Sequence, residues 1–253
     1  MTGIYMSGTG NTEHCIKKLM GIIAPHDEAI PIESEDAADK IAVHDTVILA
    51  YPTQFSNMPY MVRDFIRNCH LLWAGKKVFC MTTMGAFSGD GAGCSARLLK
   101  KYGAIIIGGA QIKMPDSVCD SKLLKKSLED NMRIVKEADE KIENIGRGIV
   151  REGKYPQEGL SFVSHLAGLF GQRLWFYGKT AGYSDKLKIG SSCTGCGICS
   201  RSCPMGNITV TAGKAEAGDR CAMCYRCISR CPQKAVTLLG KEVVEQCRFE
   251  RYC

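Results

Sequence analysis

The chain has 253 residues, 15 of them cysteine, and a formal net charge of +7. Its length leaves room for more than one domain. The number of cysteines is odd, and no basic segment followed by an apolar core stands at the N-terminus, which argues against a secreted, disulfide-bonded protein. We therefore expect a protein of the reducing cytoplasm.

The first predicted strand, over residues 3–6, runs into a loop of small polar residues and then a helix over residues 14–23. A helix N-terminus after such a loop attracts phosphate through its free backbone N–H groups and its dipole. The candidate phosphate-binding residues are Ser7, Thr9, Gly10, Asn11 and Thr12. The loop departs from the dinucleotide pattern G-x-G-x-x-G, because Glu13 stands at the third glycine position, and it lacks the Lys-Ser/Thr ending of a P-loop.

Residues 7–12, Ser-Gly-Thr-Gly-Asn-Thr, resemble the hydroxyl-rich loop with which flavodoxins hold the phosphate of FMN without a basic side chain. The rest of residues 1–145 agrees with this resemblance. Apolar runs predict strands over residues 28–32, 43–51, 77–83 and 104–113, which alternate with predicted helices over residues 58–70, 94–102 and 122–145. We expect an α/β fold, and the resemblance implies a doubly wound, five-stranded parallel sheet of order 2-1-3-4-5.

In such sheets ligands bind outside the carboxyl ends of the strands, so the loops after the third and fourth strands are expected at the flavin ring. Their candidate residues are Pro52, Thr53, Gln54, Phe55, Thr83, Met84, Gly85, Ala86, Phe87 and Gly91. Flavodoxins commonly stack a Trp or Tyr on the ring, whereas these loops offer Phe55 and Phe87, with Tyr51 and Tyr60 as substitutes. Either Phe could equally be an ordinary core or loop aromatic.

Residues 146–185 read as a linker that begins with several glycines and continues as a helical segment over residues 160–177. Apolar residues recur at helical spacing in this segment, namely Leu160, Val163, Ala167, Phe170 and Leu174. We expect their shared face to be buried in a bridge between two domains, with a membrane-surface helix or a dimer contact as alternatives. No transmembrane segment is expected, because polar residues interrupt the apolar run.

The pattern C-x2-C-x2-C-x3-C-P then occurs twice, with an offset of 28 residues. It is typical of 4Fe-4S clusters. The cysteines are Cys193, Cys196, Cys199 and Cys203 in the first copy, and Cys221, Cys224, Cys227 and Cys231 in the second. Zinc competes for paired C-x2-C units, but a tetrahedral zinc site has no use for the extra thiols.

Residues 186–240 resemble the bacterial two-cluster ferredoxins, and residues 241–253 follow as a tail. The resemblance implies a small α+β domain with two 4Fe-4S clusters, whose ligands cross between the two halves. One cluster would be held by Cys193, Cys196, Cys199 and Cys231, and the other by Cys221, Cys224, Cys227 and Cys203.

Charge argues against a nucleic-acid partner. Residues 186–240 contain eight Lys and Arg against two acidic residues, Glu216 and Asp219, so the domain without clusters carries a net positive charge. Two thiolate-bound clusters would add a charge of about −4. The holo-domain is then only mildly basic, which leaves a slight preference for an acidic redox partner.

The order of the two modules resembles the fused flavodoxin-ferredoxin proteins of anaerobic bacteria and archaea. This implies an electron-transfer protein that passes electrons between two 4Fe-4S clusters and FMN and serves a partner ferredoxin or oxidoreductase; a homo-oligomer is compatible with it. The alternative is an FMN-dependent reductase of a small organic acceptor, for which no acid–base constellation stands out in the sequence. A third interpretation is a non-redox scaffold or zinc module.

Overall fold

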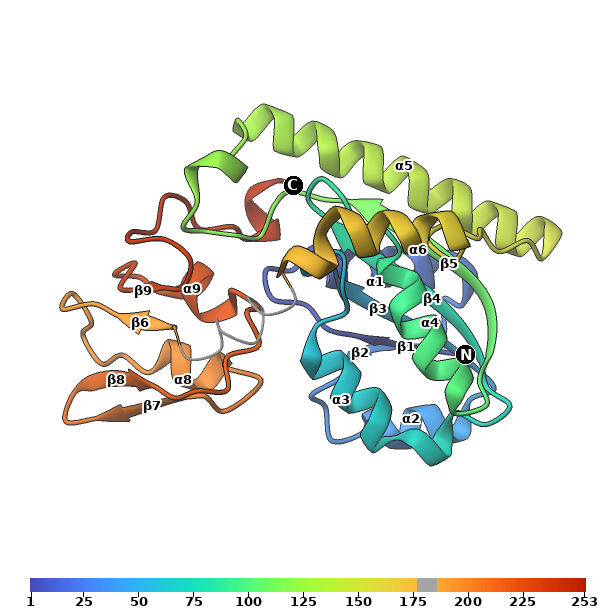
Figure 1. Cartoon of the computed structure of the whole chain (residues 1–253), viewed down its shortest axis with the longest axis horizontal. Helices are drawn as coiled ribbons and strands as arrows, with labels where there is room; N and C mark the ends of the chain where they lie inside the picture. Colours follow the sequence, from blue (N-terminus) through green and yellow to red (C-terminus); the bar gives the residue numbers. More distant parts are fainter. Residues whose placement is uncertain (177–185) are drawn as a thin grey trace.

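The computed structural model describes residues 1–176 and 186–253. The first domain is built on a five-stranded sheet of order β2-β1-β3-β4-β5, in which every neighbouring pair is parallel (Figure 1). The strands are β1 (Thr2–Tyr5), β2 (Ala29–Pro31), β3 (Thr46–Pro52), β4 (Lys77–Met84) and β5 (Ile105–Lys113). The predicted α/β class and strand order are confirmed.

Helices cover both faces of the sheet. One face packs against α1 (Asn11–Ile23) and α5 (Leu128–Glu152), and the other against α2 (Ala37–Val43), α3 (Tyr60–Asn68) and α4 (Gly91–Lys101). Alternate residues of β4 serve the two cores: Val78 packs on the α3 and α4 side, and Phe79 on the α1 and α5 side. This period of two is what a strand buried on both faces requires. Short turns η1 (His70–Leu72) and η2 (Lys122–Leu124) precede β4 and α5.

Helix α5 starts later and ends later than the sequence predicted. Its first turn is capped by Ser127, whose Oγ accepts a hydrogen bond from the Asp130 N–H at 3.0 Å. The helix continues through Gly146 and ends at Glu152, seven residues beyond the expected position 145. Gly146 is tolerated there because an added Cβ would lie 2.7 Å from Cγ2 of Ile22, so its absence lets α1 and α5 approach closely.

The stretch expected to be a linker lies instead along the edge of the sheet. The Gly109 N–H donates to the Pro156 carbonyl at 2.8 Å, and the Glu158 N–H donates to the Gly109 carbonyl at 2.9 Å. Residues 154–160 therefore extend the first domain beyond β5.

The helical segment that follows, α6 (Phe162–Gly168) and the π-helical turn η3 (Leu169–Arg173), is turned opposite to the prediction. Val163, Phe170 and Leu174 are 74%, 62% and 58% exposed. The inward side chains are polar, and they converge on the fully buried Asp90: the His165 Nδ1 lies 2.9 Å from its Oδ2, and Arg173 donates to Oδ1. A buried carboxylate needs such partners, which decides the orientation of the segment. The expected buried apolar face is wrong, and the predicted end of the helix at 177 lies outside the described residues.

The C-terminal domain is small and α+β, as expected (Figure 1). Strand β6 (Lys188–Ile189) pairs antiparallel with β9 (Val236–Thr237), and β7 (Ile208–Thr211) forms a hairpin with β8 (Lys214–Ala217). Short helices α8 (Ile198–Ser202) and α9 (Arg226–Arg230) each begin inside one copy of the cysteine pattern, and η4 (Phe249–Arg251) lies in the tail. Among residues 1–176 and 186–253, no helix combines the length and the apolar character needed to cross a membrane.

Candidate cofactor sites

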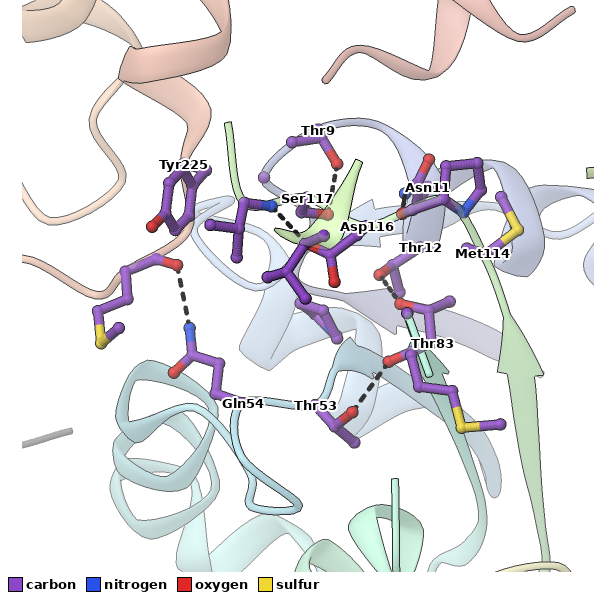
Figure 2. A pocket seen from close by; sticks show the side chains of 18 of the residues that line it. Thr9, Asn11, Thr12, Thr53, Gln54, Thr83, Met114, Asp116, Ser117 and Tyr225 are labelled. Carbon is purple, nitrogen blue, oxygen red and sulfur yellow. Dashed lines mark hydrogen bonds between the residues drawn. The ribbon is translucent and has the colours of Figure 1, made fainter. Parts of the chain in front are cut away.

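A cavity of about 250 Å³ lies at the carboxyl ends of the parallel strands (Figure 2). Most of the predicted flavin-binding residues line it: Ser7, Thr9, Asn11, Thr12, Pro52, Thr53, Gln54, Phe55, Thr83, Met84, Gly85, Ala86 and Phe87. The loops after β1, β3 and β4 thus converge where the strand order reverses, which is the place where doubly wound sheets bind their ligands.

The phosphate loop presents an uncapped helix start to this cavity. Gly10 is the N-cap of α1, with φ of 96°, and no side chain caps the helix. The surrounding hydroxyl groups are fixed in pairs: Thr12 Oγ1 lies 2.7 Å from Thr83 Oγ1, and Thr9 Oγ1 lies 2.9 Å from Ser117 Oγ (Figure 2). Free first-turn amides together with neutral hydroxyl donors suit a phosphate group, so the residues present fit FMN at this end.

Two predicted residues do not line the cavity. Gly10 supports the loop from behind, where its N–H donates to Ser7 Oγ at 3.2 Å and an added Cβ would lie 2.8 Å from Cβ of Phe249. Gly91 is the first residue of α4, and its carbonyl accepts a hydrogen bond from the Tyr51 hydroxyl at 2.6 Å. Both glycines position the site without facing it.

The aromatic candidates differ in their surroundings. Phe55 has a φ of 50° and stacks on Phe176, with ring centroids 4.5 Å apart. Phe87 is 45% exposed at the edge of the cavity. Tyr51 is fully buried, and Tyr60 donates its hydroxyl to the Arg220 carbonyl at 2.6 Å, so neither lines the cavity.

Sequence reasoning missed the loop after β5, which contributes residues 114–118 to the lining. The same argument that placed the other loops at the cavity would have found this one, because the loop after β5 also follows the carboxyl end of a parallel strand. Asp116 in this loop is the single charged side chain that lines the cavity within the described residues. Burial raises the pKa of the Asp116 carboxyl, while a hydrogen bond from the Val118 N–H, at 2.8 Å, opposes that shift.

Two further cavities lie in the C-terminal domain, each surrounded by four of the patterned cysteines. One is lined by Cys193, Cys196, Cys199 and Cys231, and the other by Cys203, Cys221, Cys224 and Cys227. The structure therefore brings together the two crossed sets that the ferredoxin resemblance implied. In residues 1–176 and 186–253, no three His, Cys, Asp or Glu side chains are grouped as they would be around a single metal ion.

Backbone N–H groups point at several of these sulfur atoms. Cys193 Sγ accepts from Gly195 and Ala215, both at 3.5 Å, and these two donors hold the pKa of the Cys193 thiol below its usual value. Cys203 Sγ accepts from Asn207 at 3.3 Å, and Cys231 Sγ accepts from Ala235 at 3.3 Å. Such donors stabilise thiolates and tune the potential of a cluster bound to them.

The two cysteine loops have the same backbone shape but different residues. Gly195 and Gly197 have φ of 66° and 74°, and Met223 and Tyr225 occupy the matching positions with φ of 53° and 62°. Left-handed backbone is costly for residues other than glycine. Met223 and Tyr225 both line the flavin-type cavity, together with Cys224 between them.

Several contacts fix this second loop against the first domain. Gln54 Nε2 donates to the carbonyls of Ala222 and Met223 at 2.9 and 3.2 Å. Arg226 Nη2 donates to the Ser7 carbonyl at 2.7 Å and pairs with Glu33 at 2.5 Å. Gln54 reaches toward this loop from the wall of the cavity in Figure 2.

Residues 192–236 match the family model described as a 4Fe-4S dicluster domain. No curated protein matches the chain. Among solved structures, the two-electron reduced flavodoxin of Megasphaera elsdenii shares 24% identity and a TM-score of 0.41, over 56% of this chain and 99% of that one. Oxidised Flavodoxin 1 of Bacillus cereus shares 20% identity and a TM-score of 0.41, over 60% and 97%. A Fusobacterium nucleatum flavodoxin mutant bound to flavin mononucleotide shares 18% identity and a TM-score of 0.35, over 42% and 67%.

The strand order assigns the fold of the first domain, and the family match assigns the second. The chain joins an α/β domain with the strand order of the flavodoxin-like fold to a small domain whose residues 192–236 match a 4Fe-4S dicluster model.

Proposed function

We propose that the protein passes electrons between two 4Fe-4S clusters and FMN, and so couples one-electron carriers to a partner oxidoreductase. The observation that carries this proposal is the position of Cys224, which lines both the flavin-type cavity and one of the four-cysteine cavities. A 4Fe-4S cluster transfers one electron at a time, whereas FMN accepts one or two. The combination can therefore couple one-electron transfer to two-electron transfer.

Separate sets of residues would hold FMN and each of the two clusters. The phosphate of FMN would be held by the start of α1 and by Ser7, Thr9, Asn11 and Thr12, and the ring would lie among the loops after β3, β4 and β5. Each cluster would be held by four cysteines. The first set is Cys203, Cys221, Cys224 and Cys227, and the second set is Cys193, Cys196, Cys199 and Cys231. The first set borders the flavin cavity, so its cluster would be the nearer one.

The farther cluster would exchange electrons with the partner protein. Cys196 in its ligand set is exposed, and Arg201, which donates to the Cys196 carbonyl at 3.3 Å, is exposed as well. A basic group beside an accessible cluster suits a partner with an acidic docking face.

A second candidate function is the FMN-dependent reduction of a small organic acceptor. The observation in its favour is Asp116, a largely buried carboxyl group with a raised pKa in the wall of the flavin cavity. Such a group can supply a proton to an acceptor that gains electrons. Turnover of a defined acceptor with reduced ferredoxin as the sole donor, and its loss in Asp116→Ala, would support this function.

The flavin assignment is tested by comparing FMN with riboflavin, which lacks the phosphate. In Thr12→Val we expect FMN to bind about tenfold more weakly or worse, because a hydrogen bond to a charged group contributes about 1.5–3 kcal/mol. Riboflavin affinity should not change. Thr46→Val is the control, since Thr46 begins β3 at the opposite edge of the sheet. Equal binding of FMN and riboflavin by the wild-type protein would contradict the phosphate site.

A further inference from the structure

Two cysteines outside the repeated pattern, Cys119 and Cys247, lie where the loop after β5 contacts the C-terminal tail. The Cys119 carbonyl accepts hydrogen bonds from the N–H groups of Val244 and Glu245 at 3.0 and 3.1 Å. This anchors the tail beside the loop. The side chains of Cys119 and Cys247 belong to one buried cluster, in which the Cys119 thiol donates to the Ser117 carbonyl at 3.5 Å and the Cys247 thiol donates to the Glu245 carbonyl at 3.7 Å. Both side chains are fully buried.

A positive charge lies against one of the two sulfur atoms. Lys125 Nζ is 2.7 Å from Cys247 Sγ. The neighbouring Cys119 thiol and the charge of Lys125 lower the pKa of Cys247, whereas the neighbouring Cys247 thiol and burial raise the pKa of Cys119. The pair is therefore asymmetric: Cys247 favours the thiolate, which is the attacking form of a thiol, and Cys119 keeps its proton.

We propose that Cys119 and Cys247 form a redox-active dithiol that closes to a disulfide in the presence of an oxidised low-molecular-weight disulfide. The Cys247 thiolate attacks one sulfur of that disulfide, forms a mixed disulfide and expels a thiolate. The Cys119 sulfur then attacks Cys247, expels the second thiolate, and its proton passes to a released thiolate. Two electrons leave the protein sulfurs, and the small disulfide becomes one thiol and one thiolate.

The disulfide would tether the loop after β5, which lines the flavin-type cavity, to the tail, which packs behind the phosphate loop. Cys119 directly follows residues 114–118 in the cavity wall. Cys247 precedes Phe249, whose N–H donates to the Thr9 carbonyl at 2.8 Å and whose ring stacks on His14 with centroids 4.1 Å apart. Closing the bond would fix the tail on the phosphate loop, and we expect it to slow the release of any cofactor held there.

The inference concerns local thiol chemistry and does not depend on the electron relay. It is tested on the anaerobically purified holoprotein, which is sampled over time in mixtures of reduced and oxidised glutathione of increasing oxidation, alkylated, digested and analysed by mass spectrometry. Cluster absorbance is recorded throughout, so that only protein with intact clusters is scored. The expected product is a peptide pair linked through Cys119 and Cys247, formed more slowly than the glutathione adduct of the exposed Cys253 because the tail must lift first.

Cys253 also shows that the oxidant is active in every sample. If Cys253 carries glutathione while Cys119 and Cys247 remain alkylated, or if either thiol pairs with another cysteine, the proposal is wrong. Lys125→Met should slow formation of the linked pair several-fold, whereas Lys126→Met, a neighbouring exposed lysine, should not. In Cys119→Ser the link should be absent and Cys247 should retain glutathione. If a variant does not fold, the wild-type result alone decides.

Discussion

Met223 and Tyr225 adopt left-handed backbone where the first cysteine loop has glycines. This costs about 1–2 kcal/mol per residue. At Tyr225 the cost is offset by a side-chain contact that glycine could not make. The Tyr225 hydroxyl donates to Asp120 Oδ1 at 3.0 Å, and Asp120 Oδ2 accepts from the N–H groups of Leu238 and Leu239 at 2.7 and 2.9 Å. The second cysteine loop is therefore held in a strained backbone conformation that fixes its position beside the flavin-type cavity.

Gly8 provides a test of that contact. A Cβ at Gly8 would overlap the carbonyl oxygen of Cys224, so Gly8→Ala should push the second cysteine loop away from the cavity. We expect iron and sulfide content to be retained and electron transfer from clusters to flavin to slow at least tenfold, measured by rapid mixing. Gly21→Ala is the matched control, because nothing lies within 4 Å of its added Cβ. Equal rates in both variants would show that the close contact is irrelevant.

At the level of single residues, the sequence predicted the phosphate loop well and the rest of the cavity less completely. Consecutive small hydroxyl residues between a strand and a helix carry their own signal. Tyr225 carried none, because its place in the cavity follows from the docking of a domain 200 residues further along the chain. Asp116 lies in the loop after β5, whereas the sequence prediction covered only the loops after the first, third and fourth strands.

Among the elements, α6 and η3 depend on Asp90 for their position. Its carboxylate is fully buried and pairs with Arg97 at 2.7 Å, with His165 and with Arg173. Asp90→Asn would leave Arg97 and Arg173 without a countercharge, and we expect about 3–5 kcal/mol of lost stability. The segment should become sensitive to chymotrypsin at its exposed aromatic residues.

The control for this change is Asp64→Asn. Asp64 forms exposed pairs with Arg63 and Arg67, which contribute about 0–1 kcal/mol. Urea unfolding of both variants measures the difference. A loss in Asp90→Asn no larger than in Asp64→Asn would contradict the anchoring role.

The reversed orientation of α6 shows what periodicity can predict. Spacing shows that Val163, Phe170 and Leu174 share one face of a helix, but not whether that face turns inward. The outcome depended on Asp90, a residue about 70 positions earlier whose burial the sequence did not reveal. Local signals were better for the sheet, where buried apolar runs such as Val47–Tyr51 have no alternative to the core.

On the scale of the whole molecule, each domain could be predicted from the sequence, but their docking could not. Strand order and cysteine spacing are properties of one domain, whereas the contacts of Gln54 and Arg226 join residues 168 and 219 positions apart. This docking places Met223, Cys224 and Tyr225 of the C-terminal domain in the wall of the flavin-type cavity.

Removal of iron tests this dependence. The core of the C-terminal domain includes the patterned cysteines Cys199, Cys221, Cys227 and Cys231, so anaerobic chelation should unfold it. We expect FMN to bind more weakly as Met223, Cys224 and Tyr225 leave the cavity, while the α/β domain keeps its circular dichroism. Reconstitution with iron and sulfide should restore affinity, as measured by flavin fluorescence. Unchanged FMN affinity in the iron-free protein would show that the cavity is complete without this domain.

The central claim is that electrons pass between clusters and FMN inside one chain. It is tested most directly by mixing the anaerobic holoprotein rapidly with a large excess of a reduced one-electron protein donor and following cluster and flavin absorbance. At saturating donor we predict that the clusters bleach first and that the flavin follows at a rate independent of the holoprotein concentration. A flavin rate proportional to that concentration, or a flavin that stays oxidised after the clusters are reduced, would contradict the account.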